Sequence, residues 1–151
     1  MDIFILGILI LVNGLFSMSE IALVSARKAR LEGQADRGDK KAKLALEMSS
    51  HPETFLSAVQ IGITLISIVT GVYSGEKFSK DLQPVIERVE LFRPYAEGIS
   101  TALIVVVVTF VSIIFGELIP KRIGLLRSEK IAKNAAGPMR FFARLFYPVV
   151  W

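Results

Sequence analysis

The chain has 151 residues, of which 52% are apolar, and it carries a formal net charge of +4 and no cysteine. The apolar fraction exceeds that of an ordinary soluble domain, and the lack of cysteine excludes disulfides, thiolate metal sites and a cysteine nucleophile. The apolar residues gather in three blocks of about 20 residues, the length that an α-helix needs to cross a bilayer. We therefore expect an all-α membrane protein, a single transmembrane domain over residues 1–151 with spans at about 3–25, 54–74 and 98–119.

The first span contains a carboxylate where water is scarce. Glu20 follows a long apolar stretch without a charge, and Asn13 and Ser17 precede it at helical spacing, so the three side chains share one face. A carboxylate near the middle of a span costs roughly 2.5–3.5 kcal/mol on insertion scales, and its default interpretation is functional. We therefore interpret Glu20 as part of a polar site inside the membrane.

The segment after the first span is basic. Residues 26–52 predict a cytoplasmic helical hairpin, which ends where Pro52 suits the first turn of the second span. Segments 26–53 and 120–151 carry more Lys and Arg than Asp and Glu, whereas residues 76–97 are mildly acidic. By the positive-inside rule both basic segments are cytoplasmic and the N-terminus is outside, as in a multi-pass protein of the cell (inner) membrane. The basic side chains then mark topology and contact membrane lipids, and we expect no nucleic-acid partner.

A stripe of polar and small residues runs along the second span. Gln60, Thr64 and Ser67 follow one another at helical spacing, and Gly71 and Ser74 continue the same face. Because lipid gains nothing from such a stripe, we expect it to line a cavity together with the polar faces of the other spans. The alternative is that these residues only allow helices to approach closely.

The third span ends in the stretch GELIPKR, residues 116–122. Ser112, Gly116 and Pro120 share a face with Glu117 beside them, and Pro120 has no N–H to pair with the carbonyl of Gly116. A free carbonyl, a carboxylate and nearby hydroxyl groups are the hard oxygen ligands that Mg²⁺ prefers. Since exposed backbone at membrane depth is tolerated only around a cavity or a protein contact, the stretch predicts a cation site.

Two simpler interpretations of these residues remain open. Pro120 would merely stop the third span beside basic residues. Glu20 would pair with Lys121 or Arg122 in a buried clamp that serves stability.

The residues after the third span predict an amphipathic juxtamembrane belt, residues 127–151, on the cytoplasmic surface. Ser128 begins a short helix that Gly137 and Pro138 end, and aromatic residues alternate with arginine beyond it. That last part lies at the interface or enters the membrane again. Because the chain stops at Trp151 inside an apolar stretch, we expect the natural protein to continue into a cytoplasmic region.

Three motifs resemble one known family. The stretches FSMSEIAL in the first span, QIGITL in the second and GELIPKR in the third are similar to the transmembrane domain of CorC/CNNM proteins, often described as hemolysin-related. The resemblance covers essentially the whole chain. It implies a homodimer with three transmembrane helices per subunit, which longer relatives extend with a cytoplasmic pair of CBS domains.

The resemblance also implies Mg²⁺ efflux with Na⁺ as the coupling ion, so that Mg²⁺ is cargo rather than a cofactor. Relatives that transport magnesium commonly have an asparagine in the second span, and this chain has none there, which makes an organic cation such as a polyamine an alternative cargo. Transferred to this chain, the family's cation ligands are Ser17 or Ser19, Gly116 and Glu117, with Glu20 nearby. The predicted cavity-lining residues are Asn13, Gln60, Thr64, Ser67, Ser112 and Pro120.

The function expected from these residues is export of divalent cations, foremost Mg²⁺, through an acidic cavity open toward the cytoplasm. One alternative is an exporter of polyamines. Another is a membrane anchor that dimerises regulatory cytoplasmic domains without transport, which predicts that Glu20→Gln and Glu117→Gln leave function intact. No histidine or cysteine lies in a span and no nucleophile–base pair is recognisable, so we expect no enzymatic activity.

Overall fold

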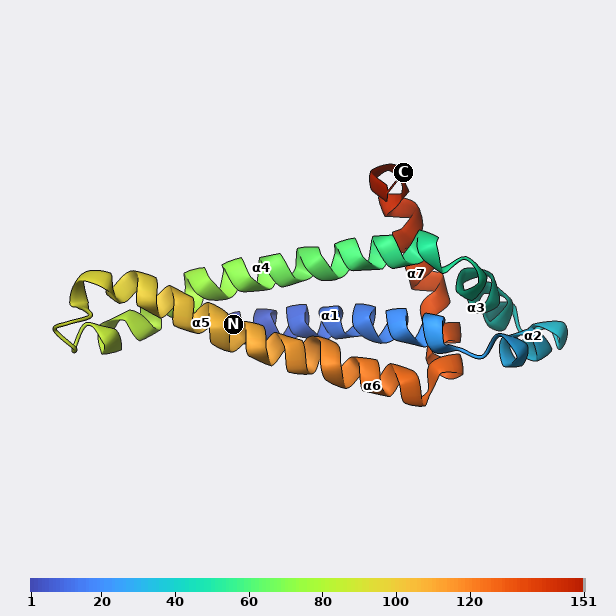
Figure 1. The fold of residues 1–151 in the computed structure, drawn as a ribbon, viewed down its shortest axis with the longest axis horizontal. Helices are drawn as coiled ribbons and strands as arrows, with labels where there is room; N and C mark the ends of the chain where they lie inside the picture. The colour runs from blue at the N-terminus through green and yellow to red at the C-terminus, as the bar shows by residue number, and fades with distance from the viewer. Residues whose placement is uncertain (151) are drawn as a thin grey trace.

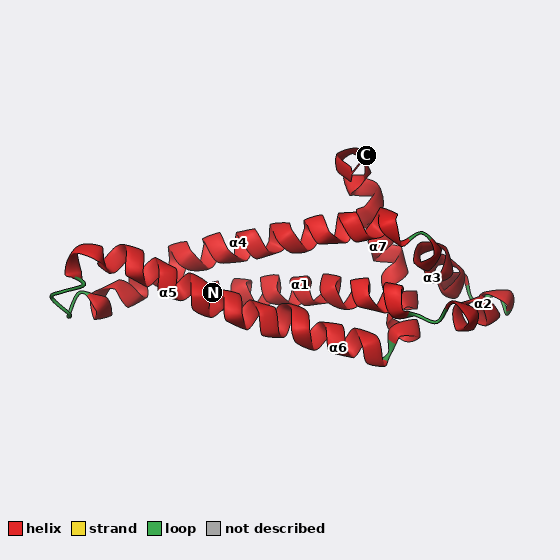
Figure 2. Ribbon diagram, viewed as in Figure 1, coloured by secondary structure: helices red, strands yellow, loops and turns green. Residues whose placement is uncertain are grey.

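The computed structural model of the protein describes the backbone of residues 1–150 and the side chains of residues 1–53 and 55–146. Over residues 1–150 the chain is helical apart from short turns and contains no strand (Figure 2). Three helical stretches are long and apolar enough to span a bilayer: Asp2–Ser25, Phe55–Ile86 and Arg93–Leu126. The expected class, an all-α membrane protein with three spans, is confirmed.

The three spans form an elongated bundle (Figure 1). Helix α1 (Asp2–Ser25) contacts both α4 (Pro52–Ile86) and the third span, which consists of α5 (Ala96–Ile113), a π-helical turn η2 (Ile114–Leu118) and α6 (Ile119–Leu126). Helices α4 and α5 pack together and extend past the N-terminus of α1, at what we call the far end. Toward the opposite end, the hairpin end, α4 and α6 diverge with α1 between them.

Helix α4 is longer than the sequence indicated. A span ending at about residue 74 was expected, but α4 continues to Ile86 with Pro84 inside it. Pro84 lies in the last turn, where its missing N–H removes a single helical hydrogen bond. At 1.5 Å per residue the helix is about 50 Å long, which exceeds the roughly 30 Å of hydrocarbon. The connection to α5 is therefore short and ends in a 3₁₀ turn, Arg93–Tyr95.

The third span also passes the proline that was expected to end or kink it near residue 119. Pro120 lies directly after the π-helical turn, and the helix continues through it to Leu126. The carbonyl four residues before Pro120, that of Gly116, accepts a hydrogen bond from Asn13 instead. The turn before Pro120 is wider than an α-helical turn, because the N–H of Ile119 donates to the carbonyl of Ile114, five residues back. The interpretation of Pro120 as a helix stop is thus wrong.

At the hairpin end, α2 (Lys28–Asp36) and α3 (Lys40–Ser50) form a helical hairpin. Gly38 has φ +92° in the turn, a conformation that disfavours residues with a side chain. Asp39 follows as the N-cap of α3, and its carboxylate accepts hydrogen bonds from the backbone N–H groups of Lys41 and Ala42 at 2.9 and 3.1 Å. The turn is therefore specified locally.

Helix α7 (Ser128–Val150) crosses the hairpin end of the bundle at a steep angle to the spans (Figure 1). The sequence predicted a helix that ends at Gly137 and Pro138, but α7 continues through both. Gly137 and Pro138 are exposed, whereas Ala136 and Met139 on either side are buried, so packing holds the helix together across the proline. The expected belt corresponds to this helix as far as Val150, and its last residue, Trp151, lies outside the described residues.

Apolar packing and ion pairs join α7 to the rest of the protein. Its Ala132, Ala136 and Met139 belong to the buried core, and Phe142 meets Phe16 of α1 edge to face, with ring centroids 4.8 Å apart. Each exposed ion pair is worth little alone, but a row of them fixes the register of α7 on the hairpin. Three pairs form that row: Arg30–Glu129 at 3.4 Å, Asp39–Lys133 at 3.0 Å and Glu47–Arg140 at 3.7 Å.

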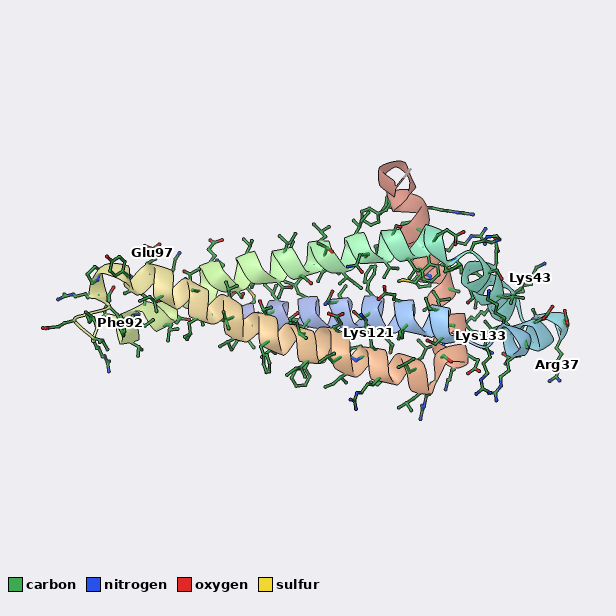
Figure 3. All side chains as sticks on the ribbon, viewed as in Figure 1. Arg37, Lys43, Phe92, Glu97, Lys121 and Lys133 are labelled. Atoms are coloured by element: carbon green, nitrogen blue, oxygen red, sulfur yellow. The ribbon has the colours of Figure 1, made fainter. Side chains whose placement is uncertain are left out.

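Side chains of Arg37 and Lys43 mark the hairpin, and Phe92 and Glu97 mark the far end (Figure 3). Lys121 lies between these ends, on the third span. It carries a charge at the same level as the two carboxylates that the sequence singled out.

Candidate functional site

Helix α1 and the third span are packed so closely that glycines are required between them. A Cβ added at Gly14 would lie 2.9 Å from Cγ of Pro120, and one at Gly124 would lie 2.8 Å from the carbonyl oxygen of Met18. Real Cβ atoms essentially never approach so near, so these glycines set the distance between the helices. The polar face of α1 is thereby held against the π-helical turn.

Asn13 makes the first polar contact across this interface. Its amide Nδ2 donates to the carbonyl oxygen of Gly116 at 3.4 Å, the carbonyl that Pro120 was expected to free. Asn13 is 3% exposed, and its Oδ1 has no hydrogen-bond partner among the described residues. A buried amide oxygen without a hydrogen-bond partner costs free energy of folding, and in native structures such an atom usually binds a water, an ion or a ligand.

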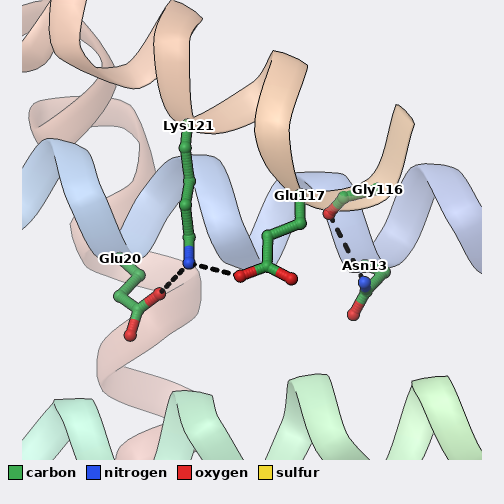
Figure 4. A network of polar contacts seen from close by, with 5 residues as sticks. All are labelled: Asn13, Glu20, Gly116, Glu117 and Lys121. Atoms are coloured by element: carbon green, nitrogen blue, oxygen red, sulfur yellow. Dashed lines mark hydrogen bonds and ion pairs between the residues drawn. The ribbon is translucent and has the colours of Figure 1, made fainter. Parts of the chain in front are cut away.

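The two carboxylates meet one ammonium group. Nζ of Lys121 lies 2.7 Å from Oε1 of Glu117 and 3.7 Å from Oε2 of Glu20 (Figure 4). Glu117 and Lys121 are one turn apart on the third span, whereas Glu20 comes from α1. Glu20, Glu117 and Asn13 project to the same side, toward α4. From the sequence, Lys121 was considered only as one possible partner for Glu20 in a clamp. The contact between Lys121 and Glu117 was not predicted, although the two residues are four apart, a spacing that places them on one face of a helix.

A small cavity lies next to Glu117, between α1, α4 and α5. Its volume is about 60 Å³, which is room for a few water molecules. Polar side chains and a glycine of all three spans surround it, so the stripes do converge there. The lining residues are Asn13, Ser67, Thr70, Gly71, Val108, Thr109, Ser112, Ile113 and Glu117.

Gln60 and Thr64 lie elsewhere. Both are exposed and line an open groove whose other residues, Ser57, Ile61, Leu65 and Ile68, also belong to α4. The reason is that α4 diverges from the third span toward the hairpin end, so this part of its stripe faces no opposing helix. The structure therefore brings Ser67 to the cavity but neither Gln60 nor Thr64.

The two candidate serines of α1 also separate. Ser17 is fully buried on the face of Asn13 and Glu20, and its Oγ has no partner among the described residues. Ser19 lies on another face, where it lines an apolar groove against α7, and its Oγ donates to the carbonyl of Leu15 at 2.6 Å. Of the two, Ser17 is the one placed with the polar site.

Charge at the site comes from few groups. Among the described residues, no group of three or more Asp, Glu or His side chains is arranged to hold a metal ion. His51, the one histidine of the chain, is exposed at the start of α4, 3.9 Å from Glu53. The charged side chains that meet at the site are thus Glu20, Glu117 and Lys121.

Comparisons with known proteins agree with one another. The family described as the cyclin M transmembrane N-terminal domain matches residues 4–151. A UPF0053 protein of Synechocystis sp. is 47% identical over the whole chain, and UPF0053 protein YhdT of Bacillus subtilis is 34% identical over 99% of it. Polyamine export protein of Salmonella typhimurium is 36% identical over 99% of the chain. The chain covers 34%, 32% and 33% of these proteins, about a third of the length of each.

Proposed function

The chain belongs to the cyclin M transmembrane domain family, and from this premise we propose that it moves cations across a membrane through the cavity beside Glu117. The observation that carries the proposal is the cavity itself, which Asn13 of α1 and the acidic residue Glu117 both line. A polar cavity at this depth costs stability unless it is occupied. A cation in the cavity would lie beside the one acidic residue of its lining, Glu117.

Organic amines are the cargo that the polar contacts favour. Lys121 carries a primary ammonium on an alkyl stem, and the pairing of this group with Glu20 and Glu117 is the pairing that a polyamine needs. The relative named polyamine export protein supports the same class of cargo. Export of polyamines is therefore our first candidate, ahead of the Mg²⁺ that the sequence favoured.

Mg²⁺ is the second candidate, with Na⁺ as the coupling ion. The carboxylate of Glu117, the carbonyl of Gly116 and Oδ1 of Asn13 are hard oxygen ligands of the kind that Mg²⁺ takes. Mg²⁺ keeps several of its waters when it binds few carboxylates, and the cavity has room for a few. The second span has no asparagine, and the polar side chains of that helix that line the cavity are Ser67 and Thr70.

The surroundings of the site complete the proposal. We place the hairpin end in the cytoplasm of a cell (inner) membrane and the N-terminus outside, because Lys and Arg dominate the hairpin and α7. Exposed apolar side chains along all three spans leave room for lipid and for a second copy in a homodimer. A cytoplasmic CBS-domain region, proposed from the family, would follow α7.

Export from proteoliposomes tests the function. Glu117→Gln keeps the shape of the side chain but removes its charge, and we expect it to reduce spermidine or Mg²⁺ flux at least about tenfold, the effect of losing about 1.4 kcal/mol of binding. Glu97→Gln, a matched change of an exposed glutamate at the far end, should leave flux unchanged. If neither the unchanged protein nor Glu117→Gln moves either cation, the protein acts as a membrane anchor instead. Equal flux in both proteins would show that the cations do not use the site at Glu117.

Competition identifies the cargo. Spermidine flux is measured with increasing Mg²⁺, and Mg²⁺ flux with increasing spermidine, in the same vesicles. Flux of spermidine that persists at millimolar Mg²⁺ supports the first candidate. Flux of Mg²⁺ without any flux of spermidine replaces it with the second.

A further inference from the structure

Lys121 holds a position that cargo would need. Its ammonium lies between the two carboxylates of the site, and Glu117, the nearer of them at 2.7 Å, lines the cavity. Building on the proposed function, we propose that Lys121 is a tethered competitor of the cargo: its ammonium pairs with Glu20 and Glu117 when the site is empty, and an incoming dication displaces it.

The geometry distinguishes a competitor from a structural clamp. The short contact, 2.7 Å, is to Glu117 on the same helix, and the contact that crosses to Glu20 on α1 is the longer one, 3.7 Å. In a clamp between helices we would expect the contact with Glu20 on α1 to be the shorter one. The two helices are also held by the close approaches at Gly14 and Gly124, which do not involve the lysine.

The ammonium of Lys121 has room to move away from the two carboxylates. The side chains of Lys121 and Glu117 are 33% and 39% exposed, so the chain itself does not enclose the pair. Lys121 lies five residues before the end of α6 at Leu126. That is about 7.5 Å along the helix, and a lysine that extends its stem covers most of this distance toward the membrane interface.

The charges then select the cargo. With Lys121 in place, the three groups sum to one negative charge, and with Lys121 displaced the two carboxylates carry two. A dication such as putrescine replaces the lysine and neutralises both carboxylates. A monoamine of the same carbon length replaces it but leaves one carboxylate unpaired inside the protein, which is costly. The proposal therefore names a doubly charged cargo and predicts discrimination against butylamine.

Binding to the purified protein in lipid nanodiscs tests the idea, with putrescine as the probe in equilibrium dialysis. Lys121→Met removes the competitor, and because the apparent affinity of a site scales with the fraction of time it is free, we expect putrescine to bind about 10–100-fold more tightly. Arg122→Met is the matched control: it removes a neighbouring positive charge that is exposed and makes no ion pair with the described side chains. It should change affinity less than about twofold. Weaker or unchanged binding in Lys121→Met would overturn the proposal.

A second measurement does not depend on a variant. In the unchanged protein, an amine-reactive ester labels Lys121 slowly while the ammonium is paired. Saturation with tetramethylated putrescine, whose tertiary amines do not form stable amides, should increase labelling of Lys121 several-fold and leave exposed Lys130 unchanged. Unaltered or reduced labelling of Lys121 would refute displacement.

The results that would refute the role of Lys121 differ from those that would refute the proposed function. If Glu117→Gln binds putrescine and Mg²⁺ as the unchanged protein does, the site does not bind cargo and the function fails. If Glu117→Gln loses binding while Lys121→Met gains none, the function stands and only the role of the lysine is lost.

Discussion

Replacing Gly124 with alanine should push α1 and α6 apart. The added Cβ would meet a side-chain atom of Ile21 and, at 2.8 Å, the carbonyl oxygen of Met18. The side chain of Ile21 has other rotamers, but the carbonyl belongs to the backbone of α1 and moves only with that helix. Gly124→Ala therefore displaces a whole helix rather than a single side chain.

The expected magnitude follows from two opposing effects. Alanine is a better helix former than glycine by about 1 kcal/mol, which favours the variant. Forcing one extra carbon into a closely packed interface costs about 1–3 kcal/mol. A matched change, Gly7→Ala, isolates the second effect, because a Cβ at Gly7 of α1 has no neighbour within 4 Å. We expect Gly124→Ala to be less stable than Gly7→Ala by about 1–3 kcal/mol.

Reversible unfolding in mixed micelles, monitored by far-UV circular dichroism, measures this difference. The same preparation tests whether the site is disturbed, since Lys121 lies one turn before Gly124 and its 3.7 Å contact with Glu20 crosses the widened interface. Putrescine binding should therefore change in Gly124→Ala and not in Gly7→Ala. Equal stability of the two variants would show that the helices are not held at the distance described, and the reasoning would fail.

The remaining predictions concern α7, the acid stability and the cavity. The Lys133 ammonium, and then the N–H of Ala42, hold the pKa of Asp39 below its ordinary value of 3.8. The ionised Asp39 therefore stabilises the fold fully above pH 3.8, and this stabilisation is lost as the pH falls through the lowered pKa. Asp39→Asn should therefore lose less stability between pH 5 and pH 2 in acid unfolding than the unchanged protein does. Phe142→Ala should cost about 2–3 kcal/mol of unfolding free energy, below the range for a fully buried phenylalanine, since Phe142 is only partly buried. Asn13→Ala should cost about 0.5–1.5 kcal/mol through the lost hydrogen bond and should weaken putrescine binding; a variant with intact binding would exclude Oδ1 as a ligand.

The sequence predicted correctly those features that depend on a single helix. The three spans follow from apolar length alone, and the face shared by Asn13, Ser17 and Glu20 follows from helical period. Both are properties of a single helix, and the structure shows the spans and places this face against the third span.

The sequence predicted less well those features that depend on how two helices pack against each other. Gln60 and Thr64 share the stripe with Ser67, but the divergence of α4 from the third span separates them from the cavity. Pro138 was interpreted as the end of a helix because local preference disfavours proline inside a helix. Packing on either side of Pro138 made it tolerable there. The second contact of Lys121, with Glu117, was missed because a basic residue after a span is usually a topology signal.

The π-helical turn over Ile114–Leu118 has a consequence for how this sequence can change by insertion or deletion. A π-helical turn contains one residue more than an α-helical turn, so deleting any one residue here restores a regular helix of nearly the same hydrophobic length. The wider turn advances the chain around the helix axis by about as much as an α-helical turn does, so every residue after the deletion would keep its direction. Gly124 would still face α1, and Lys121 would still face the carboxylate of Glu20. A single-residue deletion in the regular helix α5 would instead rotate all later residues by about 100°. We therefore expect deletion of Leu118 to keep α1 and α6 in contact, whereas deletion of a residue in the middle of α5 separates Lys121 from Glu20 although composition and span length are almost unaltered.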